Sequence, residues 1–112
     1  MICKPGELVG IPFPYSDLTT PKKRPVLVLT FPDRHGDFMG LAVTSIPTEE
    51  SAVPIDNESM VAGHLPKPSW IRYDKIFTLS ENIVIRNYGT LNIDIFLKVR
   101  EKLCSYLGCT NP

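Results

Sequence analysis

The stretch VLVLTF at residues 26–31 decides the fold class of this chain, because its β-branched and leucine side chains follow one another almost without a polar interruption. Such a run, opened by Pro25, is typical of a strand that is buried on both faces. Residues 32–36 supply the proline, polar and glycine residues of a turn, and residues 37–45 then predict a second central strand. The centre of the protein is therefore expected to be a β-sheet.

Further short strands and one helix are predicted around this pair. The strand ranges are residues 7–13, 52–55, 69–73, 75–79 and 82–88, with a bend near Asp74, and residues 46–67 are otherwise irregular. Asn92 is a suitable N-cap for a terminal helix that ends before Gly108. Its apolar residues recur at helical spacing, and they are Phe96, Val99, Leu103 and Leu107. About five to seven short strands and one C-terminal α-helix predict a mainly β fold, a small curled SH3-like barrel.

The composition indicates a single domain over residues 1–112, since 43% hydrophobic and 21% charged residues are ordinary for a folded domain of this length. Twelve basic residues balance twelve acidic ones, and the sequence pI is 6.7. This balance argues against a general nucleic-acid coat protein, which normally carries a basic excess. Any contact with nucleic acid must therefore depend on a local cluster of cations.

The cysteines do not predict a metal site or a disulfide framework. Cys3, Cys104 and Cys109 are odd in number, and they form no pair with the spacing of zinc ligands, alone or with His35 and His64. We therefore expect reduced thiols and no metal or other cofactor. A signal peptide pattern is absent from the sequence, and no stretch approaches the roughly 20 apolar residues of a membrane span. A cytoplasmic location without membrane contact is expected.

Two local patterns have both a structural and a functional interpretation. Lys22, Lys23 and Arg24 precede Pro25 at a loop-to-strand junction. They form either a solvated basic turn or a phosphate-binding group, in which Arg24 points into a groove and the lysines add charge. At the end of the second central strand, the hydroxyls of Thr44 and Ser45 either satisfy backbone groups or hold a phosphate oxygen.

The most informative pattern is Trp70-Ile71-Arg72-Tyr73-Asp74. In an extended strand, the two-residue period puts Trp70, Arg72 and Asp74 on one face. This arrangement is either a salt bridge beside an exposed tryptophan, or a carboxylate, a guanidinium and a stacking surface directed at one place. Single-stranded RNA is bound by stacking its bases on aromatic rings, which would give Trp70 a function.

These side chains suit the cleavage of RNA, which carries its own nucleophile in the 2′-hydroxyl. A carboxylate such as Asp74 could take the proton of that hydroxyl, while Arg24 and Arg72 stabilise the charge that grows on the phosphate. A guanidinium is a poor literal acid at neutral pH because its pKa exceeds about 12. The identity of the acid therefore stays open at this point, and no step requires a metal.

The same residues, in their order along the chain, resemble the MazF/PemK family of toxins. The ordered pieces are Gly6-Glu7 with Pro12-Phe13-Pro14, the Arg-Pro step within residues 23–29, residues 42–45, residues 69–79, and residues 88–91 before the closing helix. Each piece is weak alone, but the set runs over nearly the whole chain. The chain departs from the family pattern at Ile46-Pro47, where many relatives carry a glutamine.

The resemblance implies a dimer of SH3-like barrels with an RNA groove across the subunit interface. The chain would be the toxin of a type II toxin–antitoxin system, a metal-independent endoribonuclease that cuts single-stranded mRNA at specific sequences and so inhibits translation and growth. Its products would be a 2′,3′-cyclic phosphate and a 5′-hydroxyl. An acidic antitoxin protein would occupy and block the groove, and DNA would be contacted only indirectly, through that antitoxin.

The resemblance also implies roles for individual residues. Arg24 and Thr44 match the catalytic pair of one branch of the family, whereas Arg72 and Asp74 match an acid and base pair of the PemK-like branch. The residues that we expect to bind RNA beside them are Lys22, Lys23, Ser45 and Trp70.

Two other functions are compatible with a barrel of this kind. One is a toxin that acts on a protein target, as the CcdB type does, and the other is a non-catalytic interaction barrel. Neither requires an arginine, threonine and aspartate cluster, so the combination of Arg24, Thr44, Arg72 and Asp74 favours the ribonuclease.

Overall fold

The computed structural model describes residues 3–13 and 22–109. The loop at residues 15–23, expected to be mobile without RNA, falls outside the described residues except for its last two positions. The strands are β1 (Glu7–Phe13), β2 (Lys22–Val28), β3 (Asp37–Thr44), β4 (Ala52–Ile55), β5 (Met60–Gly63), β6 (Ser69–Ser80) and β7 (Arg86–Leu91). Two 3₁₀ turns, η1 (Asn57–Ser59) and η2 (Glu81–Ile83), and one α-helix, α1 (Ile93–Leu107), complete the described elements.

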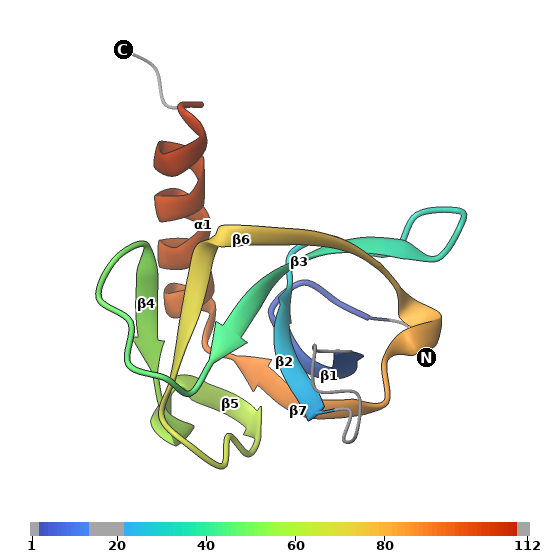
Figure 1. Ribbon diagram of the computed structural model, residues 1–112, viewed down its shortest axis with the longest axis horizontal. Helices are drawn as coiled ribbons and strands as arrows, with labels where there is room; N and C mark the ends of the chain where they lie inside the picture. The colour runs from blue at the N-terminus through green and yellow to red at the C-terminus, as the bar shows by residue number, and fades with distance from the viewer. Residues whose placement is uncertain (1–2, 14–21, 110–112) are drawn as a thin grey trace.

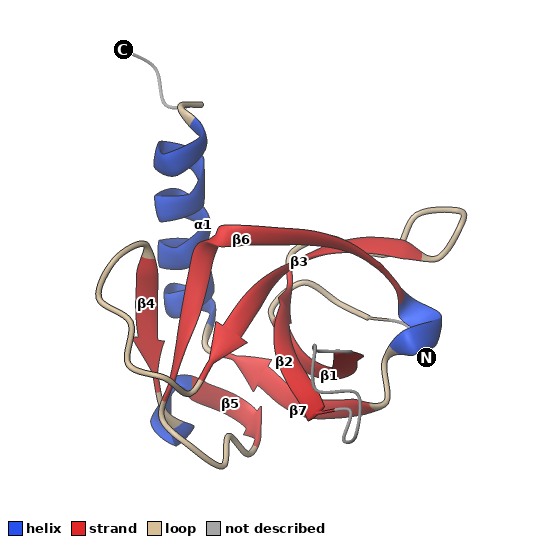
Figure 2. Cartoon of the chain, in the orientation of Figure 1, coloured by secondary structure: helices blue, strands red, loops and turns tan. Residues whose placement is uncertain are grey.

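All seven strands belong to one antiparallel sheet in the order β4-β6-β3-β2-β1-β7-β5. The sheet curls upon itself, and α1 stands beside the corner at which β6 changes direction (Figure 1). Figure 2 shows that strands dominate and that α1 is the only long helix in the described part. The predicted mainly β class with one terminal α-helix is confirmed.

The central strand β2 is buried on both faces, as its sequence predicts. Leu27 lies in a core cluster beneath α1, whereas its neighbours Val26 and Val28 lie in a second cluster on the opposite face. The first cluster includes Phe96, Val99 and Leu103 of α1. The strand covers Lys22–Val28 instead of continuing to Phe31, which is 63% exposed.

The long strand β6 contains the predicted bend near Asp74. Its pairing with β3 passes from Ala42 opposite Arg72 to Leu41 opposite Ile76, so residues 73–75 form a bulge. A bulge of this kind bends a strand and re-aims the side chains within it. The corner of β6 in Figure 1 lies within this element.

Two sequence expectations about the remaining elements are wrong. The predicted strand at residues 82–88 is instead the η2 turn, capped by the Ser80 hydroxyl, followed by β7, which continues through Gly89 to Leu91. Residues 46–67 contain β5 and η1 in addition to the predicted β4. Leu107 is 59% exposed because α1 extends beyond the edge of the core, whereas Asn92 caps the helix as expected through a 2.8 Å bond from the Asp94 amide.

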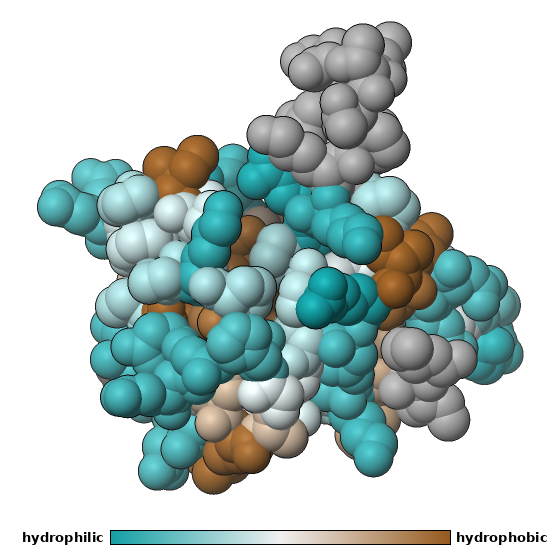
Figure 3. All heavy atoms as spheres, turned by 90° about the horizontal axis from the view of Figure 1, so that it is seen from below, coloured by the Kyte–Doolittle hydropathy of each residue, from teal (hydrophilic) through white to brown (hydrophobic). Residues whose placement is uncertain are grey.

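The cysteines Cys3, Cys104 and Cys109 are free thiols. Burial of Cys3 raises the pKa of its thiol. No helix in the described part of the chain is long and apolar enough to cross a lipid bilayer. On the face seen in Figure 3, apolar residues form small groups separated by polar ones.

The strands β5 and β7 approach each other closely at two glycines. Gly63 and Gly89 lie opposite each other, with φ of +81° and +135°. A Cβ on Gly63 would lie 2.0 Å from the Tyr88 carbonyl oxygen, and one on Gly89 would lie 2.1 Å from the Ala62 carbonyl oxygen. Only glycine fits both the dihedral angle and the space.

Replacing Gly89 by alanine is therefore expected to lower the free energy of unfolding by at least about 3 kcal/mol, the sum of a strained backbone and a displaced neighbouring strand. Urea denaturation measures the change. Gly108→Ala is the matched control, because Gly108 also has a positive φ of 76° but a Cβ there would meet no neighbouring side chain or strand within 4 Å. It should cost only about 1 kcal/mol, and equal losses in the two variants would contradict the close approach.

Candidate functional site

Two adjoining pockets share Arg24, Pro25 and Val43 where the pairing of β2 with β3 stops. Ala42 and Thr44 line one and Ser45 lines the other, so the two pockets open on opposite faces of β3. The first, of about 400 Å³, is called the phosphate pocket here; its other lining residues are Val26, Ala42, Thr44, Ile46, Arg72, Lys75 and Phe77. The second, of about 520 Å³, is called the side pocket; its other lining residues are Lys23, Ser45, Leu65, Pro66, Lys67, Ser69 and Tyr88. Arg24 is thus placed where both pockets meet.

The first residues of β2 present Arg24 to both pockets. Pro25 lies opposite Gly10 of β1, and pairing with β3 begins only at Val26. Since a proline has no amide hydrogen for a ladder bond, it suits the position at which one side of a strand loses its partner. The residues before it pair with β1 alone, so the half-buried Arg24 lies at an open edge. The loop-to-strand junction that the sequence predicts at this position is therefore already strand.

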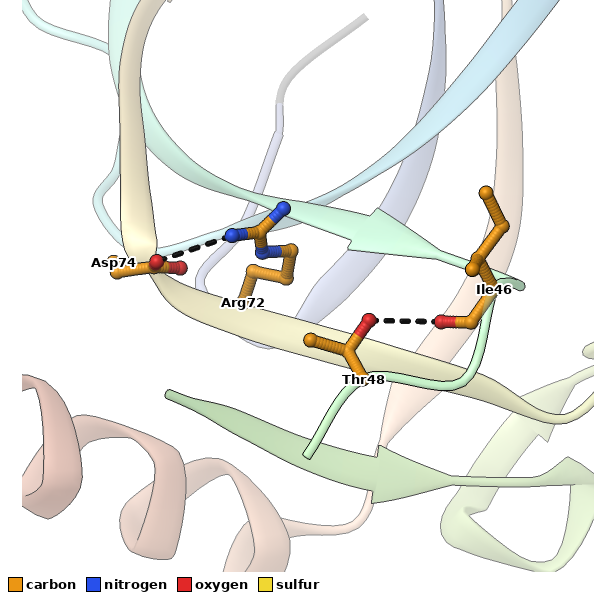
Figure 4. A network of polar contacts seen from close by, with 4 residues as sticks. All are labelled: Ile46, Thr48, Arg72 and Asp74. Carbon is orange, nitrogen blue, oxygen red and sulfur yellow. Dashed lines mark hydrogen bonds and ion pairs between the residues drawn. The ribbon is translucent and has the colours of Figure 1, made fainter. Parts of the chain in front are cut away.

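The bulge of β6 brings Arg72 and Asp74 together. Arg72 Nη2 donates to Asp74 Oδ2 over 3.1 Å, and the two side chains are 33% and 20% exposed (Figure 4). Arg72 Nε and Asp74 Oδ1 are buried without a hydrogen-bond partner among the described residues. Buried polar atoms without partners are rare and costly, and a catalytic role is one of the explanations for them. The salt bridge expected from the sequence is present, and it lies at the wall of the phosphate pocket.

Thr44 lies at the end of β3 and lines the phosphate pocket. Its Oγ1 accepts a 3.1 Å hydrogen bond from the Ile46 amide, and the Thr48 hydroxyl donates to the Ile46 carbonyl over 2.8 Å (Figure 4 shows the second bond). The backbone-capping interpretation of this hydroxyl is therefore correct. It is compatible with a function in binding, because an accepting hydroxyl keeps its own hydrogen for donation to a ligand.

The charge of the two pockets is strongly positive although the chain as a whole is balanced. Their cationic lining residues are Lys23, Arg24, Lys67, Arg72 and Lys75, and no aspartate or glutamate is among the described lining residues. Asp74 does not line the phosphate pocket itself, but it forms an ion pair with Arg72, which does. A cluster of this kind is the local field that binding of a polyanion requires.

The structure brings together most of the residues that the sequence singles out. Arg24, Thr44 and Arg72 line the phosphate pocket with Asp74 attached, and Lys23 and Ser45 line the side pocket. Trp70 instead lines a separate hollow with Pro54 and Pro68, so the expected convergence of Trp70 with Arg72 is not observed. Trp70 and Arg72 lie on the regular part of β6 before the bulge, but Trp70 is two residues farther along the strand, opposite Pro54 of β4, and this distance along the strand separates it from the phosphate pocket. Lys22 begins β2, but its side chain lies outside the described part.

Three lining residues were missed by sequence reasoning. Lys67 lies between Pro66 and Pro68, and this bracketing by prolines, which stiffens the backbone, was a usable signal. Lys75 directly follows the Arg-x-Asp pattern and could have been included with it. Tyr88 gave no local signal, because only the pairing of β7 with β1 brings it to the site.

The two histidines are exposed, His35 in the turn after β2 and His64 after β5, and neither lines either pocket. Within residues 3–13 and 22–109, no group of three or more His, Cys, Asp or Glu side chains is placed to hold a metal ion.

Comparison with protein-family models shows the family to which the chain belongs. The model of the PemK-like, MazF-like toxins of type II toxin–antitoxin systems matches residues 4–107. The chain belongs to this family. A comparison with curated proteins gave no significant match.

Solved structures with the same fold include MazF from Deinococcus radiodurans, with 23% sequence identity, a TM-score of 0.71, and coverage of 96% of this chain and 98% of that one. A MazE–MazF structure from the same organism has 23% identity, a TM-score of 0.72 and coverage of 96% and 97%. An endoribonuclease in complex with its cognate antitoxin, from a mycobacterial species, has 19% identity, a TM-score of 0.70 and coverage of 96% and 97%. The MazF-like barrel implied by the resemblance is thereby confirmed.

Proposed function

We propose that this MazF-like toxin is a metal-independent, sequence-specific endoribonuclease that cuts single-stranded RNA, chiefly mRNA, and so inhibits translation and growth. The observation that carries the proposal is the phosphate pocket, in which Arg24, Arg72 and the Thr44 hydroxyl line one cavity beside the Asp74 carboxylate. Two guanidiniums, a hydroxyl donor and a carboxylate are together sufficient to bind a phosphodiester and to deprotonate its neighbouring 2′-hydroxyl.

In the proposed reaction, the scissile phosphate occupies the phosphate pocket with its oxygens bonded to Arg24 and Arg72. Asp74 takes the proton of the 2′-hydroxyl, whose oxygen attacks the phosphorus and displaces the 5′-oxygen of the next nucleotide. The guanidiniums stabilise the negative charge that develops on the phosphate oxygens, and the Thr44 hydroxyl positions one of them. The departing 5′-oxygen takes a proton from solvent water, and the products are a 2′,3′-cyclic phosphate and a 5′-hydroxyl.

The two catalytic pairs considered from the sequence act together in this proposal. Arg24 and Arg72 line the same pocket, so neither the Arg24 and Thr44 pair nor the Arg72 and Asp74 pair works alone. Arg72 also restrains the carboxylate, since Nη2 holds Asp74 Oδ2 at 3.1 Å. Lys23, Ser45 and Lys67 in the side pocket would bind the RNA chain next to the cleaved bond.

The same positive pockets support the proposed partners. A cognate acidic antitoxin would complement the cationic lining and exclude RNA, in line with the antitoxin complexes of the solved relatives. We also propose a homodimer that acts in the cytoplasm, with DNA contacted only through the antitoxin.

The test is incubation of the purified protein with a long single-stranded RNA in excess EDTA, with the cut sites mapped by primer extension. Discrete cuts at one short sequence, with 5′-hydroxyl ends, are the expected result. Absence of cuts from a folded protein on several unrelated RNAs would overturn the ribonuclease function and favour a protein target.

A further inference from the structure

The side pocket has the position of a nucleobase subsite next to the cleaved bond. It shares Arg24, Pro25 and Val43 with the phosphate pocket, and its volume of about 520 Å³ leaves room for a base and part of its sugar. A phosphate bonded to Arg24 would therefore place a neighbouring base at the mouth of the side pocket. This inference rests on the proposed cleavage of RNA.

The wall of the side pocket is fixed by hydrogen bonds. The His64 amide donates to the Tyr88 carbonyl over 2.9 Å, and the Leu65 amide donates to Asn57 Oδ1 over 2.9 Å. The buried Ser69 hydroxyl donates to the Lys67 carbonyl over 3.0 Å. The first bond ties this segment to β7, the second ties it to η1 and the third closes a turn at Lys67, so the backbone that carries Lys67 is fixed beside Tyr88 before any ligand arrives.

Tyr88 offers an aromatic surface within this wall. The Arg86 guanidinium lies 4.9 Å from the centre of its ring, and a cation at that distance is attracted to the face of the ring. Gly10 gives the phenol space, because a Cβ at Gly10 would lie 3.3 Å from the Tyr88 hydroxyl oxygen and 3.2 Å from the ring. Gly10 pairs with Pro25, which lines both pockets. Since Tyr88 also lines the side pocket, the part of its ring that Arg86 and the core leave uncovered can contact a base there.

The charged groups of the side pocket are all hydrogen-bond donors, and the hydroxyls of Ser45, Ser69 and Tyr88 beside them both donate and accept. Lys23, Arg24 and Lys67 only donate, and among the described lining residues no carboxylate or side-chain amide is present to accept. The keto oxygens of uracil and guanine accept hydrogen bonds, whereas cytosine and adenine present an amino group at the corresponding position. An amino group would meet ammonium and guanidinium donors, which is unfavourable.

We propose that the side pocket selects a keto base, uracil or guanine, in the nucleotide next to the cleaved bond, with Tyr88 as its stacking surface and Lys67 as the donor to its keto oxygen. Tyr88 supplies affinity for any base, because stacking does not depend on base identity. Lys67 supplies the choice between bases. The two residues therefore have separable effects on RNA binding.

The test compares binding of two 2′-O-methyl oligonucleotides, oligo(U) and oligo(C), by fluorescence anisotropy in EDTA. These ligands lack the nucleophile, so binding is measured without cleavage, and the two pyrimidines have the same size. The wild-type protein should bind oligo(U) about tenfold more tightly. Lys67→Gln should abolish this difference, whereas Lys98→Gln, a change at an exposed lysine of α1, should preserve it.

Tyr88→Leu should weaken binding of both oligonucleotides by about 5- to 150-fold, and Tyr88→Phe should retain most of the affinity. Tyr106→Leu, at an exposed tyrosine of α1, is the control. Tyr88 packs against the core, so each variant is first compared with wild type in a thermal unfolding experiment; if Tyr88→Leu is unfolded, Lys67→Gln decides alone.

The two proposals fail in different ways. Equal binding of oligo(U) and oligo(C) by a wild-type protein that cleaves RNA would overturn the keto subsite and leave the ribonuclease function standing. A tenfold preference that Lys67→Gln removes, in a protein that cleaves no RNA, would support the subsite and overturn the cleavage.

Discussion

Arg24→Ala is expected to reduce the single-turnover rate of RNA cleavage by about 10²- to 10³-fold, the usual cost of removing one donor from the charge that develops in a transition state. Arg24 lines both pockets, so its loss affects the bound phosphate as well as the path of the RNA into the side pocket. Rates are measured with excess enzyme on a short RNA that contains the cleaved sequence. The free energy of unfolding should change little, because the half-buried side chain lies near the start of β2, where the strand pairs with β1 alone.

Two further variants separate the charge from the geometry of Arg24. Arg24→Lys should recover only part of the rate, since an ammonium cannot make the two parallel bonds of a guanidinium to a phosphate. Arg34→Ala removes an exposed arginine in the turn before β3, away from both pockets, and should leave the rate unchanged. Full activity of Arg24→Ala would show that the phosphate is bound elsewhere.

Asp74→Asn is expected to lower the same rate by about 10²- to 10⁴-fold, the range for loss of a positioned general base. Asparagine has nearly the same shape and can still accept a hydrogen bond from Arg72, so the pocket should keep its form while losing the group that takes the proton. RNA binding, measured with an uncleavable 2′-O-methyl ligand, should stay the same or become tighter as a negative charge is removed. The signature is therefore a loss in rate without a loss in affinity.

Asp94→Asn, which changes an exposed carboxylate at the start of α1, is the matched control and should cleave at the wild-type rate. An unchanged rate in Asp74→Asn would remove Asp74 as the base and leave Arg24 with Thr44 as the working set. A loss in affinity as large as the loss in rate would assign Asp74 to the positioning of Arg72.

The sequence predicts the elements that are decided locally. The apolar run after Pro25 indicated a central strand buried on both faces, and Asn92 with the spacing of Phe96, Val99 and Leu103 indicated the helix. It did not predict β5, whose pairing depends on a close contact between Gly63 and Gly89 that lie far apart along the chain. The end of β2 was misplaced because the side chains of residues 29–31 are nearly as apolar as those of the strand, while only residues 26–28 pair with β3.

In the candidate site too, residues set by local spacing were predicted, and residues brought together by long-range pairing were not. The sequence predicted Arg72 and Asp74 as neighbours because two-residue spacing in a strand is a local property, and the structure contains the predicted ion pair between them. Trp70 was expected at the same site, but it lies farther along β6, opposite Pro54 of β4, and lines a separate hollow there. Lys67 and Tyr88 come from two different segments, and they meet only through the pairing of β5, β7 and β1.

The bulge of β6 should tolerate the insertion or deletion of a residue less well than the loops of this toxin do. Two of its residues turn to different surfaces: the Asp74 carboxylate meets Arg72, whereas the Tyr73 ring packs edge-on against Tyr106 of α1 at 6.0 Å between centroids. Loss of one residue there would reverse which side chain meets which surface, so the carboxylate and the helix contact would be lost in a single step. Variation in length during evolution should therefore accumulate in the connections between strands and spare residues 73–75.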